Sequence, residues 1–306
     1  MSAKIAVVGS YNVGLTVQTS RPPSIGETVL GGNFSEGPGG KGSNQAIAAA
    51  RLGAEVHFIG CVGTDRFGDD ALRLWDEEGV HAHVRRDDVP TGAGVILLFS
   101  QGDNAIVVAP GANATLTPDD IDRTEEAIAS CHVLLLQLEI PAETALYAAQ
   151  VAKAHGVTVI LNPAPAQALP RDAYRHIDVL TPNESEAHLL LGEAPDAGWG
   201  PEHLTRHLHQ LGTQTVVLTQ GKAGALIATA EGLESARAPT VRTVDPTGAG
   251  DAFNGALAVA LAEGEPLSAA VQWACYAGAY CATKMEVIPG LAHRDQLETF
   301  IHKRRL

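Results

Sequence analysis

The sequence has little positive charge and no long apolar run. Its 21 Lys and Arg residues face 35 Asp and Glu residues, which gives a net charge of −14 over 306 residues. A broadly acidic surface argues against nucleic acid or an anionic membrane as a partner, because both carry charge of the same sign. No uncharged apolar stretch of about 18 residues occurs, so the sequence predicts no membrane-spanning helix.

Cysteines are also few. They show no metal-ligand spacing, and each lies among apolar residues: Cys61, Cys131, Cys275 and Cys281. Buried, reduced thiols are the better interpretation, which favours the cytoplasm. The first residues lead directly into an apolar run at 5–8, which leaves no room for the apolar core of a secretory signal. We therefore expect a cytoplasmic protein.

What the chain does have is the composition of an ordinary globular protein, with 45% hydrophobic and 18% charged residues. Apolar runs suited to buried strands lie at residues 5–8, 56–59, 133–138, 157–161, 179–180 and 216–219. Between them lie helical patterns at 69–78, 118–130, 142–155, 184–191 and 203–211. This alternation predicts an α/β fold, a doubly wound and mostly parallel sheet flanked by helices. Ligands bind such sheets at the carboxyl ends of the strands.

Two segments break the alternation, at about 13–35 and 91–109. Both are rich in Val, Thr and Leu, and they carry turn residues at positions 31–32 and 102–104. We expect them to project from the sheet as extended strands. The length of the chain is compatible with one domain, 1–306, that includes both segments.

The most informative stretch is residues 244–255, VDPTGAGDAFNG, which leads into a helical pattern at 252–261. Small residues at Gly248, Ala249 and Gly250 let backbone N–H groups approach an anion at the positive end of that helix. Asp251 lies inside this turn, where a carboxylate beside phosphate is costly. Its position makes sense if Asp251 accepts the proton of a hydroxyl while the turn stabilises a transferring phosphoryl group.

A second glycine-rich segment, GPGGKGSNQA at 37–46, begins another helical pattern at 43–52. A dinucleotide fingerprint is excluded, because no buried strand precedes it and the next acidic residue, Glu55, comes too early. A Walker loop is excluded because Gly42 follows Lys41 and position 35 is serine. What remains is a loop whose backbone amides, Lys41 amine and Asn44 amide suit a polyhydroxylated small molecule.

Together these two segments resemble the signatures of the ribokinase-like (PfkB) family of sugar and nucleoside kinases. Further landmarks follow in family order: GSYN at 9–12, GET at 26–28, QLE at 137–139, NPAPA at 162–166 and TPNESE at 181–186. The set GGKGSNQA, QLE and NPAPA is most similar to the ribokinase branch. The resemblance implies that 13–35 and 91–109 form a small β-sheet lid, which closes on the sugar and often mediates a homodimer.

The resemblance also implies ATP-dependent phosphorylation of a hydroxyl of a small sugar. Asp251 would be the base, with Gly248, Ala249 and Gly250 as the anion hole. The residues that match sugar-binding positions are Asn12, Gly40, Lys41, Asn44 and Glu139, beside Asp251. Those that match the nucleotide side are Asn183, Glu186, Thr219, Gly221 and Lys222, with Glu186 acting indirectly on Mg²⁺. Asp245 and Thr247 match part of a monovalent-cation site, for which K⁺ is expected.

The chain departs from the ribokinase pattern in two places. Ribokinases usually carry an Asp two residues after Asn12, where it grips adjacent sugar hydroxyls, and this chain has Gly14. Ribose is therefore only one candidate beside another pentose, a deoxy-sugar, a ketohexose or a nucleoside. Glu286 stands in the loop that would complete the K⁺ site. A catalytically inactive sugar- or nucleotide-binding relative is the alternative from another class, and the intact turn with Asp251 favours the enzyme.

Overall fold

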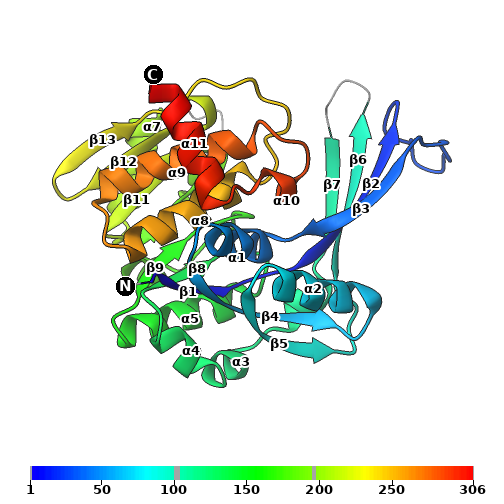
Figure 1. The fold of residues 1–306 in the computed structure, drawn as a ribbon, viewed down its shortest axis with the longest axis horizontal. Coiled ribbons are helices and arrows are strands. Elements are labelled where there is room, and N and C mark those ends of the chain that lie inside the picture. Colours follow the sequence, from blue (N-terminus) through cyan, green and yellow to red (C-terminus); the bar gives the residue numbers. More distant parts are fainter. Residues whose placement is uncertain (1, 100–103, 195–197, 306) are drawn as a thin grey trace.

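The main sheet has nine strands in the order β13-β12-β11-β10-β9-β8-β1-β4-β5 (Figure 1). The structure is a computed structural model, and it describes residues 2–99, 104–194 and 198–305. The strands are β1 Lys4–Val8, β4 Glu55–Gly63, β5 Val80–Asp87, β8 Val133–Leu136, β9 Thr158–Leu161, β10 Val179–Leu180, β11 Thr215–Thr219, β12 Ala225–Thr229 and β13 Gly232–Ala236. The strands from β5 to β11 pair in parallel, while β12 and β13 pair antiparallel.

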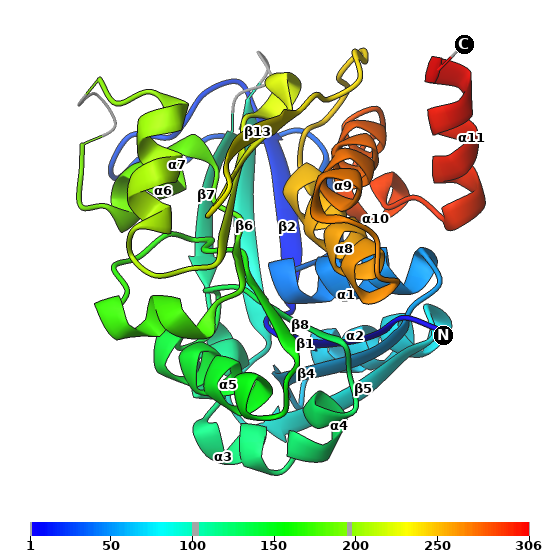
Figure 2. The same cartoon turned by 90° about the vertical axis from the view of Figure 1, so that its left-hand side faces the viewer.

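Helices cover both faces of this sheet, as Figure 2 shows. One group contains α1 Lys41–Arg51, α2 Arg66–Glu77, α8 Ala249–Ala262, α9 Leu267–Cys281, α10 Val287–Gly290 and α11 Arg294–Arg305. The other contains α3 Pro118–Asp122, α4 Glu125–Ala129, α5 Ala142–Ala154, α6 Glu184–Leu190 and α7 Pro201–His209. Short 3₁₀ turns are η1 Gly111–Thr115, η2 Arg171–His176 and η3 Gly221–Ala223. None of the helices in the described part of the chain is long and apolar enough to cross a membrane.

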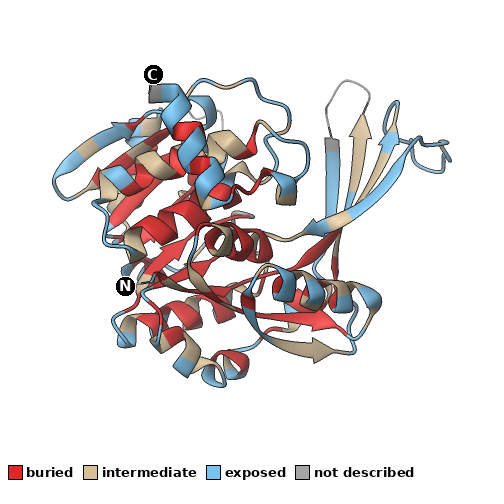
Figure 3. Ribbon diagram, viewed as in Figure 1, coloured by how far each residue is buried: buried red, intermediate tan, exposed pale blue. Residues whose placement is uncertain are grey.

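The central strands are apolar on almost every residue because both of their faces are buried. In β1, Ile5 and Val7 pack into the core beneath α1 and α8, while Ala6 and Val8 pack into the core beneath α5. Continuous apolar runs of this kind are typical of parallel strands covered on both sides. Figure 3 shows the buried residues concentrated along this sheet and the helix faces against it. The prediction of a doubly wound, mostly parallel sheet is confirmed.

Individual boundaries differ from the expected ones. The strand expected at 133–138 ends at Leu136, so Gln137 and Glu139 lie just beyond its carboxyl end. The helix expected at 118–130 is two helices, α3 and α4. The break comes at Thr124, whose hydroxyl donates to the carbonyl groups of Asp120 and Ile121 and so replaces helical partners at the end of α3.

The two β-rich segments form a separate four-stranded sheet in the order β3-β2-β6-β7, which projects beyond the main sheet (Figure 1). Its strands are β2 Asn12–Thr19, β3 Phe34–Gly39, β6 Gly92–Phe99 and β7 Asn104–Ala109. We call this sheet the lid. The expectation of a small additional β-sheet is confirmed, whereas most of the turn expected at 102–104 lies outside the described residues.

Candidate active site

The amino terminus of α8 forms the floor of the site. Gly248 precedes this helix with φ 79°, and a Cβ atom there would lie 2.5 Å from Val287 Cγ1. Both the backbone conformation and the lack of space therefore require glycine. Asp251 lies in the first turn of the helix and is 7% exposed. The turn directs backbone N–H groups of the helix start toward the space that Asp251 borders.

Two amides from α1 hold the Asp251 carboxylate. Asn44 Nδ2 donates to Oδ2 at 2.9 Å, and Gln45 Nε2 donates to Oδ1 at 3.1 Å. Burial raises the pKa of Asp251, while the Lys41 ammonium group and the two amide donors act to lower it. A carboxyl group whose pKa is raised is a better proton acceptor than an ordinary surface aspartate once it is ionised.

Glu139 organises the opposite side of the site. Its Oε2 atom accepts from Ser10 Oγ at 2.5 Å, from the Lys41 backbone N–H at 2.9 Å and from Asn12 Nδ2 at 3.2 Å. These three bonds join the ends of β1, β2 and β8 to the start of α1. One carboxylate oxygen is thereby fixed to the protein, which leaves Oε1 to accept from hydroxyl groups of a ligand.

Asn12 is oriented by a residue that sequence reasoning missed. Asn113 in η1 is fully buried; its Oδ1 accepts from Tyr11 N at 3.0 Å, and its Nδ2 donates to Tyr11 O at 2.8 Å and to Asn12 Oδ1 at 2.9 Å. The Asn12 amide must therefore present its NH₂ group to Glu139 and the site. Gly92 at the start of β6 leaves the space for this pair, because a Cβ atom there would collide with both amides.

The loop before α1 approaches the β2 backbone very closely. Gly40 has φ 89°, and a Cβ atom there would lie 2.6 Å from Asn12 N, so no other residue fits. The next residue, Lys41, is half-buried. Burial alone would lower the pKa of Lys41, but the carboxylates of Asp251, Glu139 and Glu186 outweigh burial and raise it. Lys41 is therefore a stable cation between the acidic groups.

Two cavities adjoin each other beside the start of α8. The smaller one, of about 200 Å³, is lined by Lys41, Asn162, Ala164, Thr181, Asn183, Glu186, Thr219, Gly248, Gly250, Asp251 and Asn254. The larger one, of about 560 Å³, includes Thr219, Gly221, Lys222, Gly250 and a mostly apolar set from 238–243 and 275–282. They share Thr219 and Gly250, so an apolar pocket continues into a polar cleft that carries the base.

Asn183 and Glu186 have a structural role that the sequence did not reveal. Asn183 Oδ1 accepts from Glu186 N, and Glu186 Oε2 accepts from Asn183 N, each at 2.8 Å. This is a capping box at the start of α6. Burial raises the pKa of Glu186, while its bond to Asn183 and the Lys41 cation act to lower it. Both residues also line the smaller cavity.

Asp245, Thr247 and Glu286 lie together beside the α8 turn. Asp245 Oδ1 accepts from Thr247 N at 2.9 Å and Oγ1 at 2.6 Å, and Oδ2 accepts from Glu286 N at 3.2 Å. Glu286 has φ 65°, a left-handed backbone conformation that is uncommon for a residue other than glycine. The two segments that the resemblance assigns to a cation site are therefore adjacent.

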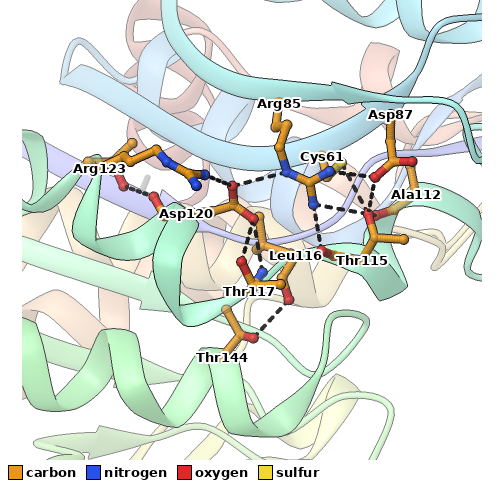
Figure 4. Close-up of polar contacts among 11 residues, drawn as sticks. Cys61, Arg85, Asp87, Ala112, Thr115, Leu116, Thr117, Asp120, Arg123 and Thr144 are labelled. Atoms are coloured by element: carbon orange, nitrogen blue, oxygen red, sulfur yellow. Dashed lines mark hydrogen bonds and ion pairs between the residues drawn. The ribbon is translucent and has the colours of Figure 1, made fainter.

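A partly buried polar network anchors η1 (Figure 4). Arg85 Nε donates to Asp120 Oδ1 at 3.0 Å, and its Nη2 donates to Thr115 O at 2.5 Å. Asp87 accepts from Arg85 Nη1 and from Thr115 Oγ1. Because Thr115 ends the turn that carries Asn113, these bonds anchor the support of Asn12 to the edge strand β5.

All expected site residues thus border one region, apart from the loop residues Asp245 and Thr247 at its edge. Sequence reasoning missed Asn113, Gln45 and the apolar lining of the larger cavity. Gln45 follows Asn44 in the glycine-rich segment 37–46, so this motif could have indicated that Gln45 lies near the site. Asn113 gave none, because its contact with Asn12 depends on the path of η1.

Comparison with known proteins identifies the family of this chain. The sequence profile described as "pfkB family carbohydrate kinase" matches residues 2–294. The chain is 37% identical to a ribokinase of Bacillus subtilis strain 168 over 300 residues, covering 97% of this chain and 99% of that protein. It is 36% identical to a deoxyribokinase of Salmonella typhimurium strain LT2 over 282 residues, covering 91% and 92%.

A solved structure shows the same fold. The structure of Arabidopsis thaliana ribokinase complexed with ribose and ATP matches with a TM-score of 0.88 and 30% identity, covering 98% of this chain and 99% of that one. The profile match spans nearly the whole chain, and the curated relatives match it over most of their length. The chain therefore belongs to the pfkB family of carbohydrate kinases, phosphotransferases that take an alcohol group as acceptor.

Proposed function

We propose that the protein transfers the γ-phosphoryl group of ATP to a hydroxyl of a small sugar, with Asp251 as the base. The observation that carries this proposal is the position of Asp251. Its carboxylate is buried in the first turn of α8, held by two amide donors, and borders a polar cleft that continues into an apolar pocket. A proton acceptor and an anion-binding helix start thus face one space.

In the reaction, the sugar hydroxyl oxygen forms a bond to the γ-phosphorus, and the bond from that phosphorus to the β–γ bridging oxygen breaks. The hydroxyl proton passes to Asp251, and the electron pair of the broken bond stays on ADP. Negative charge is spread over the phosphoryl oxygens during transfer, so the N–H groups of Gly248 and Gly250 and the Lys41 cation would stabilise it. The expected third donor, Ala249 N, donates to Pro246 O at 3.1 Å in this structure and would have to break that bond to contribute.

The larger cavity fits the nucleoside part of ATP. Its lining is mostly apolar and includes Ala238, Pro239, Val241, Phe253 and Ala279. A flat base suits such a pocket, and the triphosphate would then run past Thr219 and Gly250 toward Asp251. Gly221 and Lys222 border the same cavity at its exposed side. Asn183 would line the phosphate path.

The residues present fit Mg²⁺ indirectly and K⁺ directly. No group of three or more acidic, His or Cys side chains within 2–99, 104–194 and 198–305 could hold a metal on its own. Triphosphate oxygens would therefore supply the ligands of Mg²⁺, with Glu186 acting through water. Asp245 and Thr247, with carbonyl groups of their loop, offer the oxygen donors that K⁺ would need. When bound, these cations neutralise phosphate charge.

The sugar is most simply a pentose that is recognised without a strong contact to a vicinal diol. Ribokinase and deoxyribokinase relatives are nearly equally identical to this chain, so identity does not choose between their substrates. Gly14, in contrast, bears on the choice between these sugars. It lies two residues after Asn12 on the same face of β2, and glycine contributes no acceptor there. We therefore propose that 2-deoxyribose and ribose are used with similar efficiency.

We also propose a homodimer through the lid. On one face the lid exposes the large apolar side chains of Phe34, Val95 and Val107, whereas Ile106 and Val108 are exposed on the other face because neighbouring strand residues alternate. A contiguous patch of this kind favours association, and a second copy presents the same patch. Light scattering should give twice the chain mass, and Val107→Lys should shift the protein toward monomer; a monomeric wild type would contradict this proposal.

The cytoplasm is the proposed compartment. All four cysteines are free and buried, which suits a reducing environment. The proposed substrate ATP is also available there.

Turnover of a sugar panel tests the proposed function. Purified protein with ATP, Mg²⁺ and K⁺ should consume ATP in the presence of ribose or 2-deoxyribose, and mass spectrometry should detect the sugar phosphate. Turnover only with a ketohexose, a polyol or a nucleoside would correct the substrate class. If no sugar of the panel is phosphorylated although the protein binds ATP, the protein would instead be a catalytically inactive sugar- or nucleotide-binding relative.

A further inference from the structure

Gln45 is fully buried in α1, and all its polar atoms are used. Its Nε2 atom donates to Asp251 Oδ1 at 3.1 Å and to Asn162 Oδ1 at 3.2 Å, which uses both N–H bonds. Its Oε1 atom accepts from Gln137 Nε2 at 2.7 Å. Gln45 therefore connects the proposed base to the ends of β8 and β9.

The direction of these bonds is forced by the ionised carboxylate. Asp251 can only accept, so Gln45 must present its NH₂ group to it, and its carbonyl oxygen must then face Gln137. Gln137 must in turn present its own NH₂ group. Rotating the Gln45 amide by half a turn would place oxygen against the Asp251 oxygen and NH₂ against NH₂ of Gln137. The amide of Gln45 therefore has one acceptable orientation.

The same set of bonds returns to the helix that carries the base. Asn162 Nδ2 donates to Thr181 O at 3.2 Å, and Thr181 Oγ1 donates to Asn254 Oδ1 at 2.6 Å. Asn254 Nδ2 donates to the carbonyl of Gly250 at 2.8 Å. The base and the peptide of the anion-binding turn are thus connected through a path of side-chain amides and the Thr181 hydroxyl and carbonyl groups.

Asn44 contrasts with Gln45, although both donate to Asp251. Within the described part of the chain, Asn44 Oδ1 has no hydrogen-bond partner, so only one bond fixes the Asn44 amide. Gln45 is fixed by three. Of the two donors, Gln45 is the one that can impose a direction on the carboxylate.

We propose that Gln45 is a positioning residue for the reaction, which holds Asp251 oriented and ionised. This inference rests on the proposed function, because it assigns a role relative to Asp251 as base. Burial disfavours the charged carboxylate, and a fixed amide donor offsets part of that cost. Gln45 does not itself contact the reacting atoms in this account. This role of Gln45 also explains why Gln137 of the QLE segment and Asn162 of the NPAPA segment are hydrogen-bonded to Gln45.

The test is the pH dependence of kcat/KM in Gln45→Met, which keeps the volume and removes the donor. The acid limb should move upward by roughly one pH unit, because the ionised carboxylate loses a hydrogen bond. At the alkaline plateau kcat should fall by about 10- to 100-fold from misorientation of the base. The KM for ATP should stay within about two-fold, since the nucleotide pocket is unchanged.

Thr144→Val is the matched control. Thr144 is as deeply buried as Gln45 and donates a single hydrogen bond, to Leu116 O at 2.8 Å (Figure 4). It lies in α5, on the face of the main sheet opposite to α8, which carries the base (Figure 2). It should lose stability without any shift of the acid limb. If Gln45→Met behaves like this control, with lower thermal stability and an unchanged pH profile, the inference is overturned.

Two further variants keep the test decisive. If Gln45→Met does not fold, Gln137→Met is used in its place. This change removes the hydrogen bond that fixes the Gln45 amide, so the acid limb should move upward by less than in Gln45→Met. An unchanged acid limb overturns the inference. In an Asp251→Asn background, Gln45→Met should add no further rate loss, because the residue acts through the carboxylate. A fully additive loss contradicts the positioning role. Near-normal activity of Asp251→Asn alone would instead refute the base assignment itself.

Discussion

Restoring a carboxylate at position 14 should change which sugar the enzyme prefers. Gly14 lies in β2, between Gly37 of β3 and Gly94 of β6, on the same face as Asn12. A Cβ atom at Gly14 would lie 3.5 Å from Gly37 O and 3.8 Å from Ile96 Cδ1, which are ordinary contacts. Gly14→Asp should therefore fold without strain and place an acceptor beside the sugar site.

The size of the effect follows from hydrogen bonding to a charged group, which contributes about 1.5–3 kcal/mol. Ribose offers an adjacent pair of hydroxyls to this carboxylate, whereas 2-deoxyribose lacks one of them. Since each 1.4 kcal/mol is about a factor of ten, the ratio of kcat/KM for ribose over 2-deoxyribose should rise by about 10- to 100-fold in Gly14→Asp.

Steady-state kinetics with both sugars measures this ratio. Gly14→Ala is the control, because it fills the same space without an acceptor and should leave the ratio unchanged. An unchanged ratio in Gly14→Asp would mean that another residue already binds the diol, and the reasoning from Gly14 would be wrong. An equal rise in the alanine variant would attribute the effect to packing instead.

Three further predictions concern the base, the nucleotide side and the sugar side. Burial raises the pKa of Asp251, so the acid limb of the pH profile of kcat/KM should lie above the ordinary aspartate pKa of about 3.9. An acid limb at or below that pKa would contradict the assignment of Asp251 as the base. Ala279→Phe should raise the KM for ATP by about 10-fold or more through overpacking of the larger cavity, with the sugar KM unchanged; equal effects on both would refute the assignment of that cavity. Gly92→Ala should displace Asn12 and Asn113 and lower kcat/KM for the sugar by about 10-fold or more, while ATP binding measured by calorimetry stays the same; intact sugar kinetics would show that this amide pair does not set the site.

The sheet could be predicted because its central strands are buried on both faces and so read as uninterrupted apolar runs. The strands that do not show such runs lie toward the edges of the sheet, where that signal fails. In β5, VHAHVRRD, the alternation of His81 and His83 with apolar residues indicates a strand, but only Val80 is buried, so no apolar run appears. The hairpin of β12 and β13 was missed. Helix α9 was missed because it is apolar around nearly its whole circumference and shows no helical period.

The residues of the site were easier to name than their contacts. Glycine-rich segments at helix starts can be recognised in the sequence, because their function depends on the conformation of a few consecutive backbone residues. The roles of Gln45 and Asn113 depend on partners more than 90 residues away in sequence, Gln137 and Tyr11, which no local pattern reveals. Likewise, the capping box of Asn183 and Glu186 shows that a residue can match a binding position and also stabilise a helix.

Asp251→Asn is the most direct perturbation of the central claim, because the structure can accommodate it. The introduced amide would present oxygen to Gln45, whose donor direction is fixed. It would present its NH₂ group to Asn44. The Asn44 amide can rotate so that its Oδ1 atom accepts this bond, because Oδ1 has no hydrogen-bond partner among the described residues. The folded-state pKa of Asp251 is raised, so folding disfavours its charge, and stability rises as pH falls through that pKa toward the unfolded value. Removing the charge should therefore not destabilise the protein at neutral pH.

The decisive measurement is sugar phosphorylation by Asp251→Asn beside ATP binding and thermal stability of the same sample. We predict that kcat falls by about 10²- to 10⁴-fold, equivalent to about 2.7–5.4 kcal/mol in the barrier, with ATP affinity within a few-fold and a melting temperature no lower than wild type. Near-full turnover in this folded, ATP-binding variant would contradict the assignment of Asp251 as the base.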